Sequence, residues 1–259
     1  MKTEAVIEHI TDWLGDYCRD TGQRGFVIGV SGGIDSAVSS TLAARTGLPL
    51  LVVEMPIHQG HDQVSRARDH IAFLKERHAA VDSIEVELTD VFDRLVAVLP
   101  DAAADERRDM SLVNTRARLR MTTLYYFAAL DGRLVVGTGN KVEDFGIGFF
   151  TKYGDGGVDL SPIADLMKTE VYELGRGLGV GEAILAAPPT DGLWGDDRTD
   201  EDQIGASYPE LEWAMEFEGN EAALDERRRE VLAIYRRFQA ANRHKMEPIP
   251  VCAIPDALR

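Results

Sequence analysis

Residues 29–36 read GVSGGIDS and separate an apolar run, GFVIGV (25–30), from a helix-like segment that begins near residue 35. A glycine-rich turn between a strand and a helix directs unpaired backbone N–H groups and the positive end of the helix dipole toward an anion, which favours phosphate binding. The common nucleotide loop GxxxxGK[ST] also supplies a lysine for the terminal phosphates. This stretch has Asp35 and no lysine. Because a carboxylate repels a phosphate, Asp35 is predicted to hold a magnesium ion that bridges to it; an ordinary glycine turn with a serine cap is the alternative.

The other apolar patterns alternate between strands and helices. Strands are predicted at 25–30, 49–55, 83–89 and 133–138, and helices at 35–45, 61–78, 91–99, about 109–130, 168–180 and 227–245. This alternation predicts βαβ units, and therefore an α/β fold with a mostly parallel sheet flanked by helices. Ligands bind such sheets at the carboxyl ends of the strands, where GVSGGIDS and GTGNKVED (137–144) both lie. No domain boundary is evident, so we expect residues 1–259 to form a single domain.

Composition and charge argue against several classes of protein. The net charge of −16 opposes general nucleic-acid binding, which depends on a basic surface. No apolar run approaches the ~20 residues that span a bilayer, and the acidic N-terminus lacks the pattern of a secretory signal. Cys18 and Cys252 stand far apart without a CxxC motif, so neither a disulfide framework nor a thiolate metal site is indicated. We expect a cytoplasmic enzyme that binds neither nucleic acid nor membranes.

The order of the motifs resembles one enzyme family. SGGIDS after a strand is similar to the pyrophosphate loop of the N-type ATP pyrophosphatases, which release pyrophosphate from ATP and need no lysine for the γ-phosphate. Later motifs follow one another as in the NAD synthetases of that group: NTRARLRM (114–121), GTGNKVED (137–144), GFFTKYGDGGVDLSPIADLMKTEV (148–171), PPTDGLW (188–194), DEDQIG (200–205) and RHK (243–245). The resemblance spans 29–245, and TKYGDGG with its following lysine is its most specific part.

The resemblance implies a Rossmann-like fold of the adenine nucleotide alpha hydrolase type and a ligase that forms a C–N bond. The nicotinate carboxylate of deamido-NAD would attack the α-phosphate of ATP, giving an acyl-adenylate and pyrophosphate. Ammonia would then displace AMP to form NAD. The family further implies Mg²⁺ and a homodimer with substrate sites at the interface. Glutamine-dependent members carry an additional amidase domain, for which we expect no room in 259 residues, so free ammonia or a separate partner is the predicted nitrogen source.

Residues that match the motifs of the family have the roles that the resemblance implies. The resemblance implies ATP contacts from Gly29, Val30, Ser31, Gly32, Gly33, Ile34, Asp35, Ser36, Thr138, Lys168 and Thr190. It implies contacts to the dinucleotide from Arg118, Lys152, Asp159, His244 and Lys245. Asp35 and Glu143 are the expected magnesium ligands. The expected catalytic residues are Asp35, Lys168 and Asp155, of which Asp155 is a candidate for ammonium recognition or proton removal.

Several of these residues also have ordinary structural interpretations. Arg118 fits a solvated surface arginine, and Glu143 fits a first-turn acid that complements a helix dipole. His244 and Lys245 stand at the end of a predicted helix, where such cations are common dipole complements. Asp155 is as compatible with a turn aspartate as with a catalytic group.

Two local features carry separate expectations. The stretch between Glu143 and Lys152 is one residue longer than in bacterial members of the family, and GIG (146–148) is expected to absorb the extra residue as a bulge. The stretches 79–84 and 187–207 are predicted to act as lids that order with substrates.

Two other functions compete with this interpretation. A sulfur- or amino-transferring tRNA enzyme would share the fold, but it would call for a basic face and often a CxxC motif. A regulatory module that senses ATP would not need the separate dinucleotide site that the later motifs predict.

Overall fold

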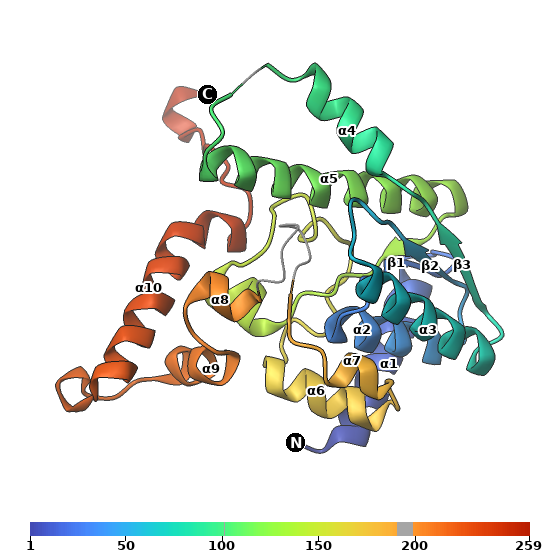
Figure 1. The fold of residues 1–259 in the computed structure, drawn as a ribbon, viewed down its shortest axis with the longest axis horizontal. Coiled ribbons are helices and arrows are strands. Elements are labelled where there is room, and N and C mark those ends of the chain that lie inside the picture. Colours follow the sequence, from blue (N-terminus) through green and yellow to red (C-terminus); the bar gives the residue numbers. More distant parts are fainter. Residues whose placement is uncertain (101, 191–198) are drawn as a thin grey trace.

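The structure, a computed structural model, describes residues 1–100, 102–190 and 199–259. A parallel sheet with the strand order β3-β2-β1-β4 lies toward one side of the molecule (Figure 1). The strands are β1 (Phe26–Gly29), β2 (Leu50–Glu54), β3 (Val81–Glu85) and β4 (Leu134–Val135). The α-helices are α1 (Thr3–Asp20), α2 (Ile34–Arg45), α3 (His61–Arg77), α4 (Thr89–Val98), α5 (Glu106–Asp131), α6 (Lys168–Gly177), α7 (Glu182–Leu185), α8 (Asp200–Ile204), α9 (Tyr208–Glu216) and α10 (Glu226–Met246). A π-helix, η1 (Val142–Ile147), and two short 3₁₀ turns, η2 (Glu221–Ala223) and η3 (Asp256–Leu258), complete the described elements.

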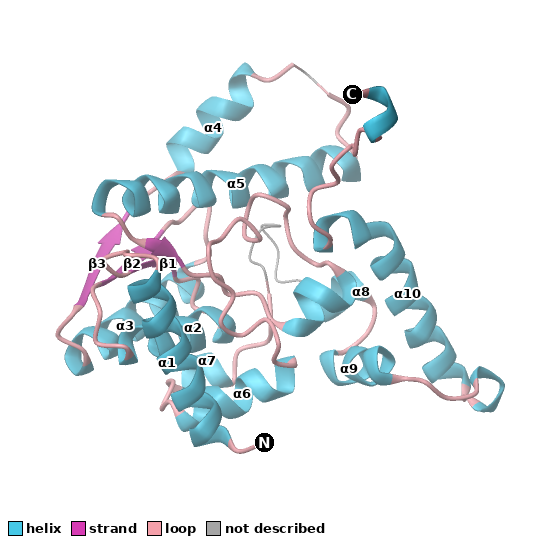
Figure 2. Cartoon of the chain, turned by 180° about the vertical axis from the view of Figure 1, so that it is seen from behind, coloured by secondary structure: helices cyan, strands magenta, loops and turns pink. Residues whose placement is uncertain are grey.

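Helices cover both faces of the sheet, because successive side chains of a strand point to opposite faces. Phe26 and Ile28 of β1 enter the core shared with α1, α2, α3 and α6. Val27 enters the core on the other face, with residues of α4 and α5. Figures 1 and 2 show α5 running across one side of the sheet and α1, α2 and α3 lying on the other. The predicted mostly parallel sheet flanked by helices is therefore confirmed.

The C-terminal helices form a further apolar core beside the sheet. Buried residues of η1, α8, α9 and α10 pack together there, including Ile147, Ile204, Leu211 and Val231. In Figure 1, α9 and α10 stand to one side of the sheet rather than on its faces. The carboxyl ends of β1 and β4 point toward the region between the sheet and this second group of helices.

The central strands have the predicted positions, but two outer strands differ in extent. β3 begins at Val81, earlier than predicted, and Val86 and Leu88 after it still donate to backbone oxygens of Glu54 and Pro56. β4 spans only Leu134–Val135, although the Val136 N–H still donates to Val27 O of β1 at 2.9 Å. On its other edge the chain bonds to the segment near Leu160, where the Gly137 N–H donates to Leu160 O at 2.7 Å.

The two predicted lids have different outcomes. A lid at 79–84 is wrong, because residues 81–85 are hydrogen-bonded into the sheet beside β2. Of the second stretch, 187–207, residues 191–198 lie outside the described residues, and α8 occupies 200–204.

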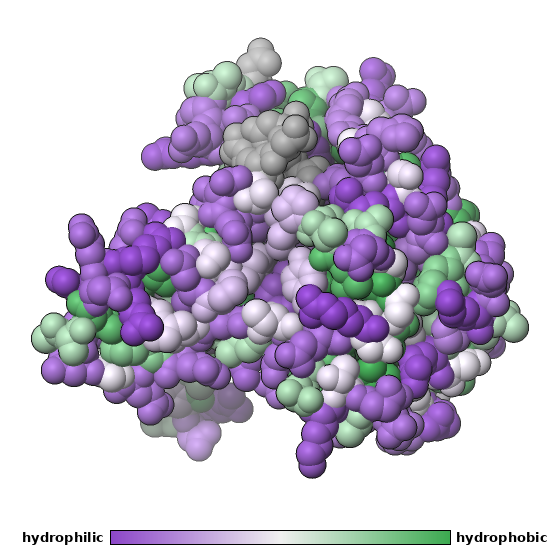
Figure 3. All heavy atoms as spheres, turned by 60° about the horizontal axis from the view of Figure 1, so that its bottom comes forward, coloured by the Kyte–Doolittle hydropathy of each residue, from purple (hydrophilic) through white to green (hydrophobic). Residues whose placement is uncertain are grey.

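Figure 3 shows a face that is mostly hydrophilic, with apolar side chains in small separate patches. Within the described residues, no helix combines the length and the apolar character needed to cross a membrane.

Candidate active site

The loop after β1 is tightly shaped and leads directly into α2. Gly32 has φ +82°, and a Cβ at this position would lie 2.5 Å from the carbonyl oxygen of Gln63 in α3. Only glycine combines this backbone conformation with such a close approach. The Ser36 hydroxyl donates to Gly33 O at 3.0 Å and accepts from Ser31 N–H at 3.3 Å, which closes the turn. The first amides of α2 have no intrahelical acceptor and therefore form an anion-binding end.

This loop forms one wall of a cavity of about 720 Å³, a size typical of a small-molecule site. Many predicted site residues line it: Gly29, Val30, Ser31, Gly32, Gly33, Ile34, Asp35, Ser36, Arg118, Thr138, Glu143, Lys152, Asp155, Lys168, Thr190, His244 and Lys245. Asp159 is the predicted site residue that is not among the residues lining this cavity. β1 and β4 are neighbours in the sheet, so the loops that follow them converge as predicted.

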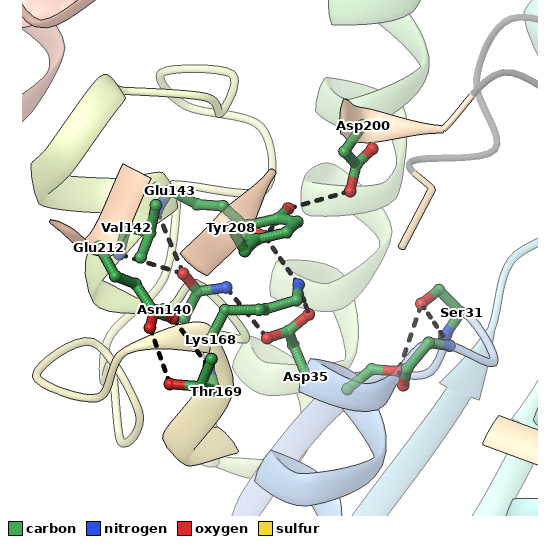
Figure 4. A network of polar contacts seen from close by, with 12 residues as sticks. Ser31, Asp35, Asn140, Val142, Glu143, Lys168, Thr169, Asp200, Tyr208 and Glu212 are labelled. Atoms are coloured by element: carbon green, nitrogen blue, oxygen red, sulfur yellow. Dashed lines mark hydrogen bonds and ion pairs between the residues drawn. The ribbon is translucent and has the colours of Figure 1, made fainter. Parts of the chain in front are cut away.

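A buried ammonium group lies at the centre of the site (Figure 4). Lys168 Nζ donates to Asp35 Oδ2 at 2.6 Å and to Glu143 Oε1 at 2.8 Å, and its side chain is only 3% exposed. Lys168 is the first residue of α6, and this helix start is tied to α9 by two hydrogen bonds from Thr169 to Glu212. The site thus joins α2, η1 and α6, which are far apart in the sequence.

Asn140 and Tyr208 complete this network. Asn140 is fully buried, donates to Asp35 Oδ1 at 3.1 Å, and accepts the backbone N–H groups of Val142 and Glu143, each at 3.1 Å. The Tyr208 hydroxyl lies 2.6 Å from Glu143 Oε1, and Lys168 Nζ lies 4.6 Å from the centre of the Tyr208 ring. Both carboxylates are therefore oriented by several neighbours.

The charges of the network shift its pKa values. Burial alone would lower the pKa of Lys168, but Asp35 and Glu143 outweigh burial and hold this pKa well above its usual value. Against the effect of burial, Lys168 and Tyr208 lower the pKa of Glu143. Burial, followed by the carboxylates of Glu143 and Asp155, raises the pKa of Asp144 to about 8. The site is therefore crowded with acidic groups around one ammonium.

Asp35 and Glu143 fit a magnesium ion that arrives with phosphates. Mg²⁺ usually takes one or two carboxylates, several waters and substrate phosphate oxygens rather than a complete cage of protein ligands. The two carboxylates contact one shared cation, Lys168 Nζ, and both line the cavity beside the phosphate loop. In the part of the chain that the structure describes, no three His, Cys, Asp or Glu side chains are arranged to hold a metal ion. The donor set therefore suits a metal shared with a ligand.

The predicted cations for the second substrate gather in the same cavity. Arg118 of α5 donates to Lys152 O at 3.3 Å, Lys152 Nζ donates to His244 O at 2.7 Å, and Lys245 Nζ donates to Phe150 O at 2.6 Å. These contacts join α5, the TKYGDGG loop and the end of α10. The arrangement brings positive charge from three segments to one part of the cavity.

Asp155 and Asp159 have different surroundings. Asp155 is open to the cavity; it accepts the Thr151 N–H at 2.9 Å, and the protein packed around its carboxylate raises its pKa. Asp159 accepts the Val135 N–H at 2.8 Å and the Tyr125 hydroxyl at 3.0 Å. Its carboxylate therefore supports the end of β4 and the side of α5, and contact with the substrate stays a prediction.

The stretch expected to contain an extra residue forms the π-helix η1 (Val142–Ile147). A π-helix has wider turns than an α-helix and often occurs at functional sites. It ends at Gly148, which has φ +63°, and Asn242 of α10 donates to Ile147 O at 2.8 Å. The π-helix covers part of GIG (146–148), where a bulge was expected, and it carries Glu143 into the site.

Known proteins resemble this chain both in sequence and in structure. The sequence profile of the family described as NAD synthase matches residues 6–248. The chain belongs to the NAD synthase family. It is 38% identical to an NH(3)-dependent NAD(+) synthetase of Carboxydothermus hydrogenoformans over 93% of this chain and 94% of the relative. It is 36% identical to one from Archaeoglobus fulgidus, with 100% of both chains covered.

Solved structures agree with this membership of the NAD synthase family. An NMN synthetase from Francisella tularensis has a TM-score of 0.85 and 30% identity, with 99% of each chain covered. An NH3-dependent NAD synthetase from Campylobacter jejuni has a TM-score of 0.78 and 25% identity, covering 98% of this chain and 100% of that one. Both the predicted resemblance and the predicted fold are therefore confirmed.

Two residues of the site, Asn140 and Tyr208, were given no role from the sequence. Asn140 lies in the GTGN segment, directly before a segment with the pattern of a helix start, so its capping of Val142 and Glu143 was accessible from local pattern. Tyr208 gives no such signal, because its hydroxyl target depends on how α9 packs against η1.

Proposed function

We propose that this NAD synthase family member amidates deamido-NAD with ammonia, using ATP and Mg²⁺, through an acyl-adenylate intermediate. The observation that carries the proposal is the Asp35–Lys168–Glu143 group, with N–O distances of 2.6 and 2.8 Å, at the end of a phosphate-type loop. Simple retention of ATP does not require the additional cations, Arg118, Lys152 and Lys245, that line the same cavity. A ligase that must hold two phosphate-containing substrates does.

The residues have distinct tasks in this reaction. The amides at the start of α2 would hold the β- and γ-phosphates, and Lys168 would offset charge that builds up on phosphate oxygens. Asp35 and Glu143 would hold Mg²⁺, which supplies positive charge to the leaving pyrophosphate. Arg118, Lys152 and the other cations of this group would orient the nicotinate substrate so that its carboxylate reaches the α-phosphate. In this scheme the bond from the α-phosphate to the pyrophosphate breaks as the carboxylate–phosphate bond forms.

Ammonia then attacks the acyl carbon, and AMP leaves. Asp155 would accept a proton from the attacking nitrogen, a role supported by its position in the lining of the cavity. Its role remains part of this proposal, as does the contribution of Asp159 to substrate binding.

The size of the nicotinate substrate is a separate question. The relatives named above are NAD synthetases, whereas the Francisella tularensis structure is described as an NMN synthetase and matches 99% of this chain. That likeness makes nicotinate mononucleotide the second candidate. We propose the dinucleotide as the preferred substrate because the notable motifs, TKYGDGG above all, follow the NAD synthetase pattern.

The test is steady-state product formation by the purified chain with ATP and Mg²⁺. Deamido-NAD and nicotinate mononucleotide are compared as acceptors, and ammonium and glutamine as nitrogen donors. We expect a higher kcat/KM with deamido-NAD and ammonium than with any other pair. Equal efficiency with glutamine would refute ammonia dependence, and a higher kcat/KM with the mononucleotide would reassign the substrate.

The assembly and location are also proposals. We propose a cytoplasmic homodimer formed by one domain per chain, with the nicotinate substrate near the dimer interface, as the family resemblance implies. Sedimentation at several protein concentrations would test the dimer, since a monomer at all concentrations would contradict it.

A further inference from the structure

The Tyr208 hydroxyl lies between two acidic groups from different elements. It is 2.6 Å from Glu143 Oε1 and 3.1 Å from Asp200 Oδ2 (Figure 4). Tyr208 is the first residue of α9, and its side chain is 3% exposed. The polar tip of a residue that belongs to the C-terminal core thus reaches into the centre of the active site.

A phenol carries one proton, so it donates to one carboxylate at a time. The shorter contact favours Glu143, and its acceptor is Oε1, the same oxygen that accepts from Lys168. A phenol is uncharged at neutral pH, so the Tyr208 hydroxyl is available as a donor. Lys168 and Tyr208 therefore both donate to Oε1 of Glu143, and neither of these two hydrogen bonds involves Oε2.

We propose that Tyr208 is a positioning residue that orients Glu143 as a magnesium ligand. This inference rests on the proposed function, because it gives Glu143 the role of holding Mg²⁺. Lys168 contacts both carboxylates and lines the same cavity as the phosphate loop, so it would share its hydrogen bonds with phosphate oxygens when ATP binds. Tyr208 is fixed by the α9 core and keeps its bond to Oε1. The carboxylate is then held through Oε1, and Oε2 is the oxygen that would face the metal.

The test compares Tyr208→Phe with a matched control, Tyr235→Phe. Tyr235 packs against the same core, but its hydroxyl accepts from Gln239 on the neighbouring turn of α10. We expect the Mg²⁺ concentration for half-maximal rate to rise about tenfold in Tyr208→Phe, the usual size of a lost hydrogen bond to a charged group. The kcat at saturating Mg²⁺ should stay near the wild-type value. Tyr235→Phe should leave both values unchanged.

A second readout does not depend on turnover. Mn²⁺ binding in the presence of ATP alone, followed by electron paramagnetic resonance, should weaken by the same factor in Tyr208→Phe. In a Glu143→Gln background the same substitution should add little further loss of Mn²⁺ affinity, because Tyr208 acts through Glu143. Additive losses, or an unfolded Tyr208→Phe chain, would show that Tyr208 supports only the core and would overturn the proposal. If the wild-type chain makes no amide product, but the Mn²⁺ affinities of wild type and variants still differ as expected, then the proposed function is refuted and the positioning role of Tyr208 is not.

Discussion

At the scale of single residues, Lys168 determines the electrostatics of the site. Its ammonium is almost entirely buried and contacts two carboxylates, so the three formal charges sum to −1. Buried charges are stable only when partners and hydrogen bonds compensate their lost hydration. Asn140 and Tyr208 provide these hydrogen bonds to Asp35 and Glu143. The remaining negative charge favours a bound divalent cation over an empty site.

A second buried titratable residue, His70, predicts how stability depends on pH. Its Nε2 lies 2.9 Å from Ser40 Oγ between α2 and α3, and burial lowers the pKa of His70 to about 4. Between pH 6.5 and 4, the unfolded chain therefore binds a proton here that the folded chain does not, so stability falls as the pH falls. With a pKa near 6.5 in the unfolded chain, this shift lowers the free energy of unfolding by about 3 kcal/mol between pH 7 and pH 4.

Urea unfolding as a function of pH measures this contribution. The His70→Gln variant should lose less stability than the wild type between pH 7 and pH 4. His61→Gln is the control, because the His61 side chain is 96% exposed, and it should follow the wild-type curve. Parallel curves for His70→Gln and the wild type would contradict a buried neutral His70.

At the scale of elements, the end of η1 depends on Gly148. This residue has φ +63°, and a Cβ on it would lie 2.4 Å from the Cβ of Asn242 in α10. Gly179 has φ +74° but no atom within 4 Å of such a Cβ. Gly179→Ala should therefore cost about 1–2 kcal/mol of backbone strain, and Gly148→Ala should cost about 1–3 kcal/mol more from the forced contact. Equal urea midpoints for the two variants would contradict the close packing of η1 on α10.

The elements that the sequence predicted well are those with a local cause. The glycine turn before α2 and the apolar runs of β1 and β2 carry their own signals, and the structure places them within one or two residues. The extents of β3 and β4 depend on neighbours: β3 is paired with β2 along its length, and Val136 still donates to Val27 O of β1 before Gly137 bonds to Leu160 O. Partners distant in the sequence set such boundaries, so periodicity alone does not find them.

The site residues also divide into those with a local sequence signal and those whose contacts depend on distant parts of the chain. Asp35, Glu143 and Lys168 were identified from motifs, and the structure brings them into contact. Tyr208 was missed because a buried tyrosine has the pattern of a core residue until its hydroxyl partner is known. Asp159 was assigned to substrate from family resemblance, whereas its carboxylate bonds to Val135 N in the sheet.

At the scale of the whole molecule, the active site joins two packed regions. Asp35 comes from the sheet and its helices, whereas Glu143 and Tyr208 come from elements of the C-terminal core. The cavity also receives cations from α5 and from the end of α10. A change in how these regions pack therefore alters metal binding and substrate orientation together, which suits a reaction that needs both substrates in place before chemistry.

The most direct measurement of the central claim is ATP–pyrophosphate exchange without ammonia. Labelled pyrophosphate should enter ATP only when deamido-NAD is present, because the acyl-adenylate forms reversibly. The Asp35→Asn variant is first shown to be folded by measuring its unfolding midpoint. This substitution should reduce the exchange rate by about 100-fold or more, as expected when a group that stabilises transition-state charge is lost. Exchange that proceeds without any nicotinate substrate, or at a near-normal rate in Asp35→Asn, would contradict the account.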